Sequence, residues 1–175
     1  LAAVTSSKIV IMDLGSRQRL VRASHEEVLS VGWSPNGQLL AIVRPGRLEI
    51  RRAKTWAKLA VRRESMLDGE ISWSQRYGIV TPLLRIRRSS VGTELVRYSN
   101  DLKHRHSVSG ALPSNGGSVD YYSPAWSPNG ACLFVVEKEA SRKSIPTGSV
   151  LVYGARKTQA VSPAGVFVSG GAWLG

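Results

Sequence analysis

The sequence has a single cysteine, Cys132, among 175 residues, so it can form neither an intrachain disulfide nor a zinc site built from several cysteines. Acidic residues are scarce: 12 Asp and Glu stand against 24 Lys and Arg, which gives a formal net charge of +12. No apolar run approaches the roughly 18 residues that a membrane-spanning helix requires. We therefore expect a fold held together by packing, no membrane span, and partners with negative charge.

Signatures of common enzyme classes are missing as well. The sequence contains no Gly-x-Ser-x-Gly elbow, no Gly-rich phosphate loop that opens a helix, and no His-Glu-x-x-His motif. His104 and His106 lack a nearby carboxylate or thiol, so we interpret them as a surface pair rather than a metal site. Cys132 lies in an apolar segment and is expected to be a buried, unreactive thiol. We predict no catalytic residue, no metal and no cofactor.

No segment has a convincing helical period, but a short motif recurs along the chain. Trp33 and Trp126 each begin a complete copy of Trp-Ser-Pro-Asn-Gly, and Trp73 and Trp173 begin variants of it. An apolar segment follows each complete copy, as expected when Pro-Asn-Gly closes a tight hairpin with Gly at positive φ. Because the four tryptophans share one strand position, we expect them to pack between neighbouring sheets.

The apolar segments around these motifs predict an all-β fold of four-stranded antiparallel units repeated around an axis. Each unit has a third strand with apolar residues at equivalent places, as in Lys8-Ile-Val-Ile-Met and Arg47-Leu-Glu-Ile-Arg, and a weaker fourth strand. The predicted divisions are 1–23 for strands two to four of a partial unit, 24–64, 65–113 and 114–163 for three complete units, and 164–175 for the first strand of a further or closing unit.

These repeats resemble those of WD-repeat and TolB-like β-propellers, most clearly in the tract Ser123-Pro-Ala-Trp-Ser-Pro-Asn-Gly. The TolB-like variety is the closer likeness, because Asp13 is the only acidic residue at the end of a third strand. The segment from Leu1 to Ile11 aligns without a gap on Leu40 to Ile50, which gives about four blades' worth of strands. We favour an excerpt of a larger propeller over two alternatives. One is a closed four-bladed ring, in which Ala172 and Ala3 would share a sheet, and the other is a half that pairs with another chain.

Basic residues are concentrated in two predicted connections between second and third strands. The resemblance implies that these connections share one rim of a propeller, and their basic residues are Arg85, Arg87, Arg88, Arg142 and Lys143. Arginine forms forked hydrogen bonds with phosphates and carboxylates, so this rim is a candidate binding surface, although a solvated charged rim is the competing interpretation. Trp56, in a turn between basic residues, is a further candidate for contact with a partner.

The leading hypothesis is a non-catalytic propeller scaffold that joins other proteins in a multi-subunit assembly through the basic rim. One alternative is an accessory propeller of a hydrolase, a peptidase or a bacterial envelope protein. The other is an RNA- or ribosome-associated propeller, in which the rim binds RNA or another polyanion. The residues do not fix the compartment, and the cytoplasm is favoured.

Overall fold

In the computed structural model the described residues form 15 β-strands and no helix. The structure describes residues 2–5, 8–13, 15–23, 26–65, 67, 69–87, 90–108, 119–130, 132–139, 147–152 and 157–160. Within each sheet, strands that are adjacent in the sequence pair antiparallel, so each sheet is a meander. The predicted all-β class with four-stranded antiparallel sheets is confirmed.

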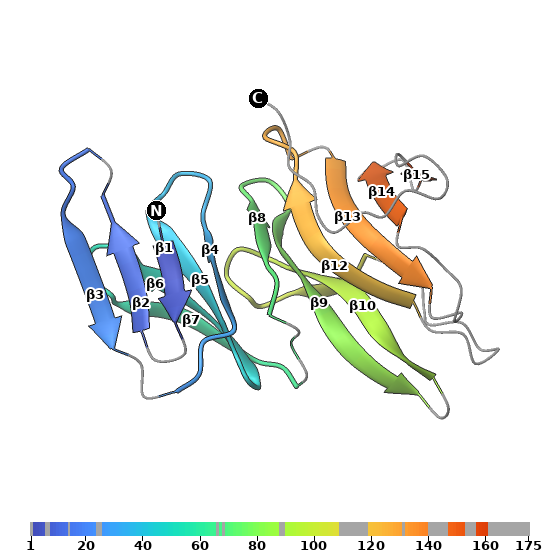
Figure 1. The fold of residues 1–175 in the computed structure, drawn as a ribbon, viewed down its shortest axis with the longest axis horizontal. Helices are drawn as coiled ribbons and strands as arrows, with labels where there is room; N and C mark the ends of the chain where they lie inside the picture. Colours follow the sequence, from blue (N-terminus) through green and yellow to red (C-terminus); the bar gives the residue numbers. More distant parts are fainter. Residues whose placement is uncertain are drawn as a thin grey trace.

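Four sheets follow one another along the chain (Figure 1). The first contains β1 (Ala2–Thr5), β2 (Lys8–Met12) and β3 (Arg19–Ala23). The second contains β4 (Ser30–Trp33), β5 (Leu39–Arg44), β6 (Arg47–Arg52) and β7 (Lys58–Arg63). The third contains β8 (Ser72–Ser74), β9 (Gly78–Arg87), β10 (Ser90–Tyr98) and β11 (Arg105–Ser107). The fourth contains β12 (Val119–Trp126), β13 (Cys132–Glu139), β14 (Thr147–Val152) and β15 (Lys157–Ala160).

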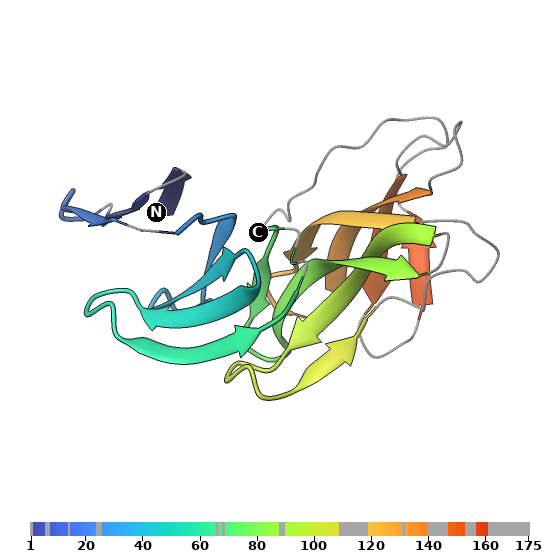
Figure 2. The same cartoon turned by 90° about the horizontal axis from the view of Figure 1, so that it is seen from below.

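Contacts between neighbouring sheets always involve the first strand of at least one of them. Strand β4 contacts both β1 and β8, whereas β12 contacts β8, β9 and, most extensively, β10. Strands β3, β7, β11 and β15 come last in their sheets and lie at the opposite, outer edges (Figures 1 and 2). Ala172 belongs to 161–175, outside the described residues, so the pairing expected for a closed ring stays untested.

Strand β5 shows why each sheet needs a neighbour on both sides. Its last five residues are all buried. Leu40 and Ile42 pack against the first sheet, whereas Ala41 and Val43 pack against the third. Successive side chains of a strand point to opposite faces, so a strand covered on both faces loses the usual alternation of apolar and polar residues.

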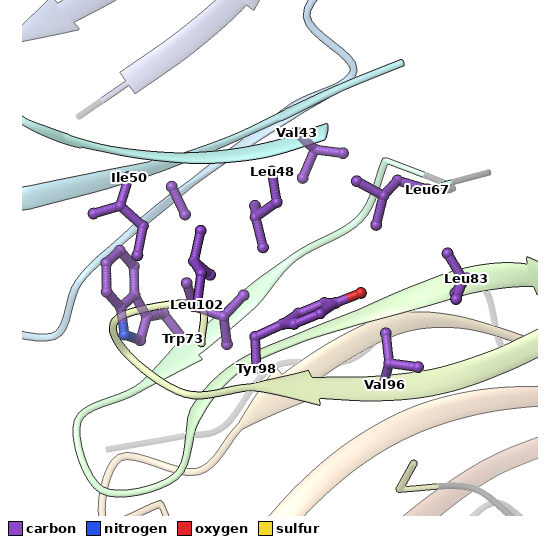
Figure 3. Close-up of a cluster of buried hydrophobic side chains, with 11 residues drawn as sticks. Val43, Leu48, Ile50, Leu67, Trp73, Leu83, Val96, Tyr98 and Leu102 are labelled. Atoms are coloured by element: carbon purple, nitrogen blue, oxygen red, sulfur yellow. The ribbon is translucent and has the colours of Figure 1, made fainter. Parts of the chain in front are cut away.

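Each boundary between successive sheets holds a buried apolar cluster with one of the repeated tryptophans. Trp73 is 9% exposed in the cluster between the second and third sheets, where Figure 3 shows Ile50 near Trp73 and Leu48 on the side facing Tyr98. Trp126 is 8% exposed between the third and fourth sheets. Trp33 is half-buried against the cluster between the first and second sheets. Trp173 lies outside the described residues.

Both complete copies of the motif form the same turn. In each, the serine hydroxyl donates to the asparagine side chain and accepts a backbone N–H from the following strand, while the glycine has positive φ as predicted. In the first copy, the Ser34 hydroxyl donates to Asn36 at 2.7 Å and accepts from Leu39 N at 2.9 Å, and Gly37 has a φ of 68°. In the second copy, the Ser127 hydroxyl donates to Asn129 at 2.8 Å and accepts from Cys132 N at 3.0 Å, and Gly130 has a φ of 71°.

The turns before β3, β7 and β11 share a geometry that the sequence does not reveal. Each places one residue other than glycine in the left-handed region: Arg17 at φ 55°, Trp56 at 62° and Leu102 at 62°. This conformation costs a residue with a Cβ about 1 to 2 kcal/mol. Backbone hydrogen bonds close the turns, for example from Arg52 N to Ala57 O at 2.9 Å.

The connection predicted over residues 85–92 is instead mostly a hairpin. Strand β9 continues to Arg87 and β10 begins at Ser90, so Arg85 and Arg87 are strand residues. The alternation of Arg85 and Arg87 with Ile86 fits an extended strand, which the density of charge had concealed. Strand β13 likewise continues to Glu139, into the second predicted connection.

The indole N–H groups of two repeated tryptophans have different surroundings. Trp73 Nε1 donates to Asn100 Oδ1 at 2.7 Å. The turn closed by Arg52 and Ala57 places Ala53 at the position that corresponds to Asn100. Trp33 Nε1 is buried and has no hydrogen-bond partner among the described residues. The repeated tryptophan of the third sheet therefore has a hydrogen-bonded indole N–H, whereas that of the second sheet does not.

A polar contact joins the second and third sheets beyond their apolar cluster. The Tyr98 hydroxyl donates to Glu64 Oε2 at 2.9 Å, and the Arg62 guanidinium lies 6.0 Å from the Tyr98 ring centroid. Arg105 Nε lies 3.6 Å from the same Glu64 oxygen. Burial of Tyr98, followed by its hydrogen bond to Glu64, raises the pKa of the phenol above its ordinary value.

The Asn100 contact leads to a stability prediction. Asn100→Ala removes the acceptor of a buried indole and should lower the free energy of unfolding by about 1 to 3 kcal/mol. Urea unfolding followed by tryptophan fluorescence measures the change. The reciprocal variant, Ala53→Asn, supplies an acceptor near Trp33 and should raise stability by about 1 kcal/mol. An unchanged midpoint for Asn100→Ala would contradict this assignment.

The Tyr98 contact leads to a pH prediction. A phenol whose pKa is raised by folding contributes stability below its unfolded pKa of about 10, and that stability is lost as pH rises above this value. We therefore expect the free energy of unfolding to fall more steeply above pH 10 in the parent than in Tyr98→Phe. Chemical unfolding at several pH values above 10 measures the free energy of unfolding of both proteins. Subtracting one from the other removes the contribution of lysine titration, which is common to both. Parallel pH profiles would contradict the prediction.

Candidate binding surface

The structure places part of the predicted basic rim. Arg85 Nε donates to Glu94 Oε2 at 2.6 Å, and Arg105 Nη2 donates to the same oxygen at 3.0 Å. Partial burial alone would raise the pKa of Glu94, but hydrogen bonds from Ser107 and Arg85 outweigh it and hold that pKa below its ordinary value. The Arg85 charge is therefore neutralised by a carboxylate of its own sheet.

The other predicted rim residues are not brought together by the described part of the chain. Arg87 is the last residue of β9, and its backbone pairs with Ser90. Arg88, Arg142 and Lys143 lie outside the described residues. Whether the five basic residues share one rim stays a prediction.

Trp56 packs within the protein. Its ring lies against the cluster between the first and second sheets, with the Arg22 guanidinium 5.6 Å and the Arg51 guanidinium 5.4 Å from the ring centroid. Arg51 Nη1 also donates to the Trp56 carbonyl at 3.1 Å. Cation–π contacts of this kind contribute about 0.5 to 2 kcal/mol. Trp56 thus joins β3 to the turn before β7.

Arg51, which contacts Trp56, is also one of three arginines around the buried carboxylate of Glu49. Glu49 is 3% exposed and accepts hydrogen bonds from Arg47 Nε at 2.6 Å and Arg51 Nε at 3.0 Å, while Arg44 Nε lies 3.7 Å away. Burial favours the protonated form, yet these hydrogen bonds and charges hold the pKa of Glu49 below its ordinary value. Arg47 also pairs with Glu26 at the surface. Glu49 therefore remains ionised and fixes three arginines on one face of the second sheet.

The outer strands carry a charge pattern that the sequence analysis missed. Strands β3, β7, β11 and β15 contain basic residues and no acidic residue, whereas β4 and β8 contain no charged residue at all. The basic residues are Arg19, Arg22, Lys58, Arg62, Arg63, Arg105 and Lys157. Comparing the four weak fourth strands by the sign of their charge would have revealed the pattern.

A cavity of about 920 Å³ opens between the first and second sheets, next to Trp33. Its lining includes the apolar residues Ile11, Leu20 and Trp33 and the charged residues Asp13, Arg19 and Lys54. Its volume is within the range of small-molecule sites. This space beside the indole accounts for the greater exposure of Trp33 compared with Trp73.

The remaining candidate groups lie at the surface. His104 and His106 are both exposed. Cys132 begins β13 and is partly exposed, so the expectation of a buried thiol was wrong, because the position next to the turn is less covered than the middle of the strand. Within the described ranges, no group of three or more His, Cys, Asp or Glu residues is arranged to hold a metal ion. Likewise, that part of the chain has no helix with the length and apolarity to span a membrane.

No family model and no curated protein matches the sequence. Solved structures do match. TolB from Acinetobacter baumannii is 14% identical, with a TM-score of 0.70 over 93% of this chain and 40% of its own. The Cps50 (Swd1) β-propeller domain from Myceliophteria thermophila is 12% identical, with a TM-score of 0.59 over 90% and 50%. The WD40 domain of Toxoplasma gondii coronin is 15% identical, with a TM-score of 0.57 over 89% and 40%.

The chain thus spans half or less of each of these three structures. At these identities the likeness concerns the fold, and it agrees with the sheet order and the buried tryptophans described above. The chain folds as part of a β-propeller, with a fold similar to those of TolB and of WD40 domains.

Proposed function

We propose that this chain is a non-catalytic propeller scaffold that binds acidic surfaces of other proteins in a multi-subunit assembly. The observation that carries the proposal is the charge of the outer strands, whose ionisable residues are all basic. A surface of one sign attracts partners of the opposite sign and speeds their association. A chain of the mitotic checkpoint complex has a similar fold, with 16% identity and a TM-score of 0.60, and supports a role in an assembly by analogy.

Three of these basic residues are suited to meet a partner. Arg19, Lys58 and Arg63 are exposed and have no ion pair within the described part of the chain. By contrast, Arg105 is held by Glu64 and Glu94, and Arg62 lies over Tyr98. The first group can therefore pair with external carboxylates without breaking an internal contact.

The sequence-predicted rim belongs to the same proposal as a second contact region. Arg85 contributes less than its charge suggests, because Glu94 neutralises it. Arg87, Arg88, Arg142 and Lys143 add basic charge near the connections that follow β9 and β13. RNA is a competing polyanion for both regions, and the test below distinguishes it from an acidic protein.

The proposal predicts that Arg19→Ser, Lys58→Ser and Arg63→Ser together weaken binding to immobilised polyglutamate, because three uncompensated charges are removed. Elution in a salt gradient measures the effect, and the triple variant should elute at lower salt than the parent. The five rim residues changed together to Ser form a second variant, which tests the second contact region and should also elute at lower salt than the parent.

A control variant carries Arg52→Ser, Lys54→Ser and Arg76→Ser, which removes the same charge from exposed positions outside the outer strands. Equal shifts for the control and the outer-strand triple would contradict a localised surface. Retention on immobilised polyuridylate that exceeds retention on polyglutamate would favour RNA over an acidic protein.

A further inference from the structure

Strand β7 is the outermost strand of the second sheet, and no other described strand pairs with its outer edge (Figure 2). Glu64 N donates to Gly46 O at 3.0 Å. From this bond and the register with β6, the backbone groups of Arg62 and Ala60 are the ones that point toward β6. Because these groups alternate along a strand, the N–H and C=O of Val61 and Arg63 point to the open edge. An extended segment can pair with them.

The exposed side chains of β7 combine apolar and basic character. Ala60 packs against the apolar cluster and Arg62 lies over Tyr98, so both face the third sheet. Val61 and Arg63 lie on the opposite face, and Val61 is 43% exposed. Leu59, at the irregularity in register with β6, is 48% exposed.

On this face an unusual row of like charges crosses the sheet. Arg44 of β5 is directly opposite Arg47 of β6, which is directly opposite Arg63 of β7. Like charges in register destabilise a sheet unless they are compensated. Glu49 and Glu26 compensate the inner two arginines, whereas Arg63 has no ion pair within the described part of the chain. The row ends on a free positive charge at an open edge.

Strands β3 and β11 have fewer exposed apolar side chains than β7 for contact with an added strand. Strand β11 has only three residues, without an exposed large apolar side chain among them. Strand β3 has one, Val21, which is 43% exposed. Strand β7 alone among these three combines two exposed apolar residues with a basic residue at each end, Lys58 and Arg63.

We propose that the outer edge of β7 is a docking site for an extended acidic segment of a partner protein, which adds to the second sheet as a fifth strand. Aliphatic side chains of that segment cover Leu59 and Val61, and carboxylates stand opposite Arg63 and Lys58. Main-chain hydrogen bonds supply affinity, and the alternate side chains supply selectivity. This proposal rests on the scaffold function above and names the surface and partner chemistry for it.

The probe is a fluorescein-labelled peptide, Glu-Thr-Val-Thr-Ile-Glu, which in antiparallel register places Val opposite Val61 and Glu opposite Arg63 and Lys58. Fluorescence anisotropy with the 175-residue chain measures its binding. A peptide with Lys in place of both Glu residues should bind at least about tenfold more weakly, because attraction becomes repulsion at two positions. A peptide N-methylated at Val keeps the charge but loses an inward N–H, and it should also bind at least about tenfold more weakly.

Variants of the chain locate the site. Arg63→Glu should weaken binding by about tenfold, and Val61→Ser by about threefold. The matched control is Val21→Ser on β3, which has the same exposed fraction and should leave binding unchanged. Circular dichroism and thermal unfolding show that each variant keeps the parent fold.

The outcomes separate this proposal from the scaffold function. If the acidic peptide binds but N-methylation and Val61→Ser have no effect, strand addition is wrong and the broader binding of acidic partners stands. If Val21→Ser weakens binding as much as Val61→Ser, the site is not on β7. If neither the peptide nor polyglutamate binds, both proposals fail. Concentration-dependent dimerisation of the parent that Val61→Ser abolishes would identify a second copy as the occupant and overturn the acidic segment.

Discussion

The structure depends on one constraint: each four-stranded sheet has two faces to cover, and only neighbouring sheets can cover them. Strand β5 meets this constraint by being apolar on both faces, with Leu40 and Ile42 on one side and Ala41 and Val43 on the other. Burying a valine, leucine or isoleucine side chain contributes about 1.5 to 3 kcal/mol. The stability of one sheet is therefore inseparable from that of its neighbours, as expected for a repeat protein.

The same constraint explains why charge increases outward. Strands β4 and β12 make the contacts between neighbouring sheets, reaching as far as the third strand β10, and the outer strands are left largely uncovered. Arginine suits the intermediate zone, because its stem packs against apolar atoms while its head reaches a carboxylate or an aromatic ring. Arg22 and Arg51 do this around Trp56, and Arg105 does it between Glu64 and Glu94. Part of the basic excess therefore belongs to the packing between sheets, and only the remainder is free for partners.

The repeat predicted the fold because its information is local. A tryptophan followed by Ser-Pro-Asn-Gly specifies a turn through hydrogen bonds within a few residues, as Ser34 and Ser127 show. The binding surface was harder to predict. The charges of Arg85 and Arg87 suggested a loop where the chain is a hairpin, and the neutralising Glu94 is recognisable only once β9 and β10 are paired. The left-handed turn at Trp56 also lacks the glycine that would have signalled it.

The basic ends of β7 can serve two purposes at once. An open edge with exposed Leu59 and Val61 is a hazard, because a second copy of the same strand could pair with it. In a symmetric antiparallel pair centred on Val61, whose backbone groups point to the open edge, Arg63 of one copy would stand opposite Leu59 of the other and next to its Lys58, so like charges would come close at both ends and oppose association. The same two charges favour a strand that carries carboxylates at those positions. Repulsion between copies and attraction to an acidic segment thus arise from the same residues, which is how an interface gains selectivity.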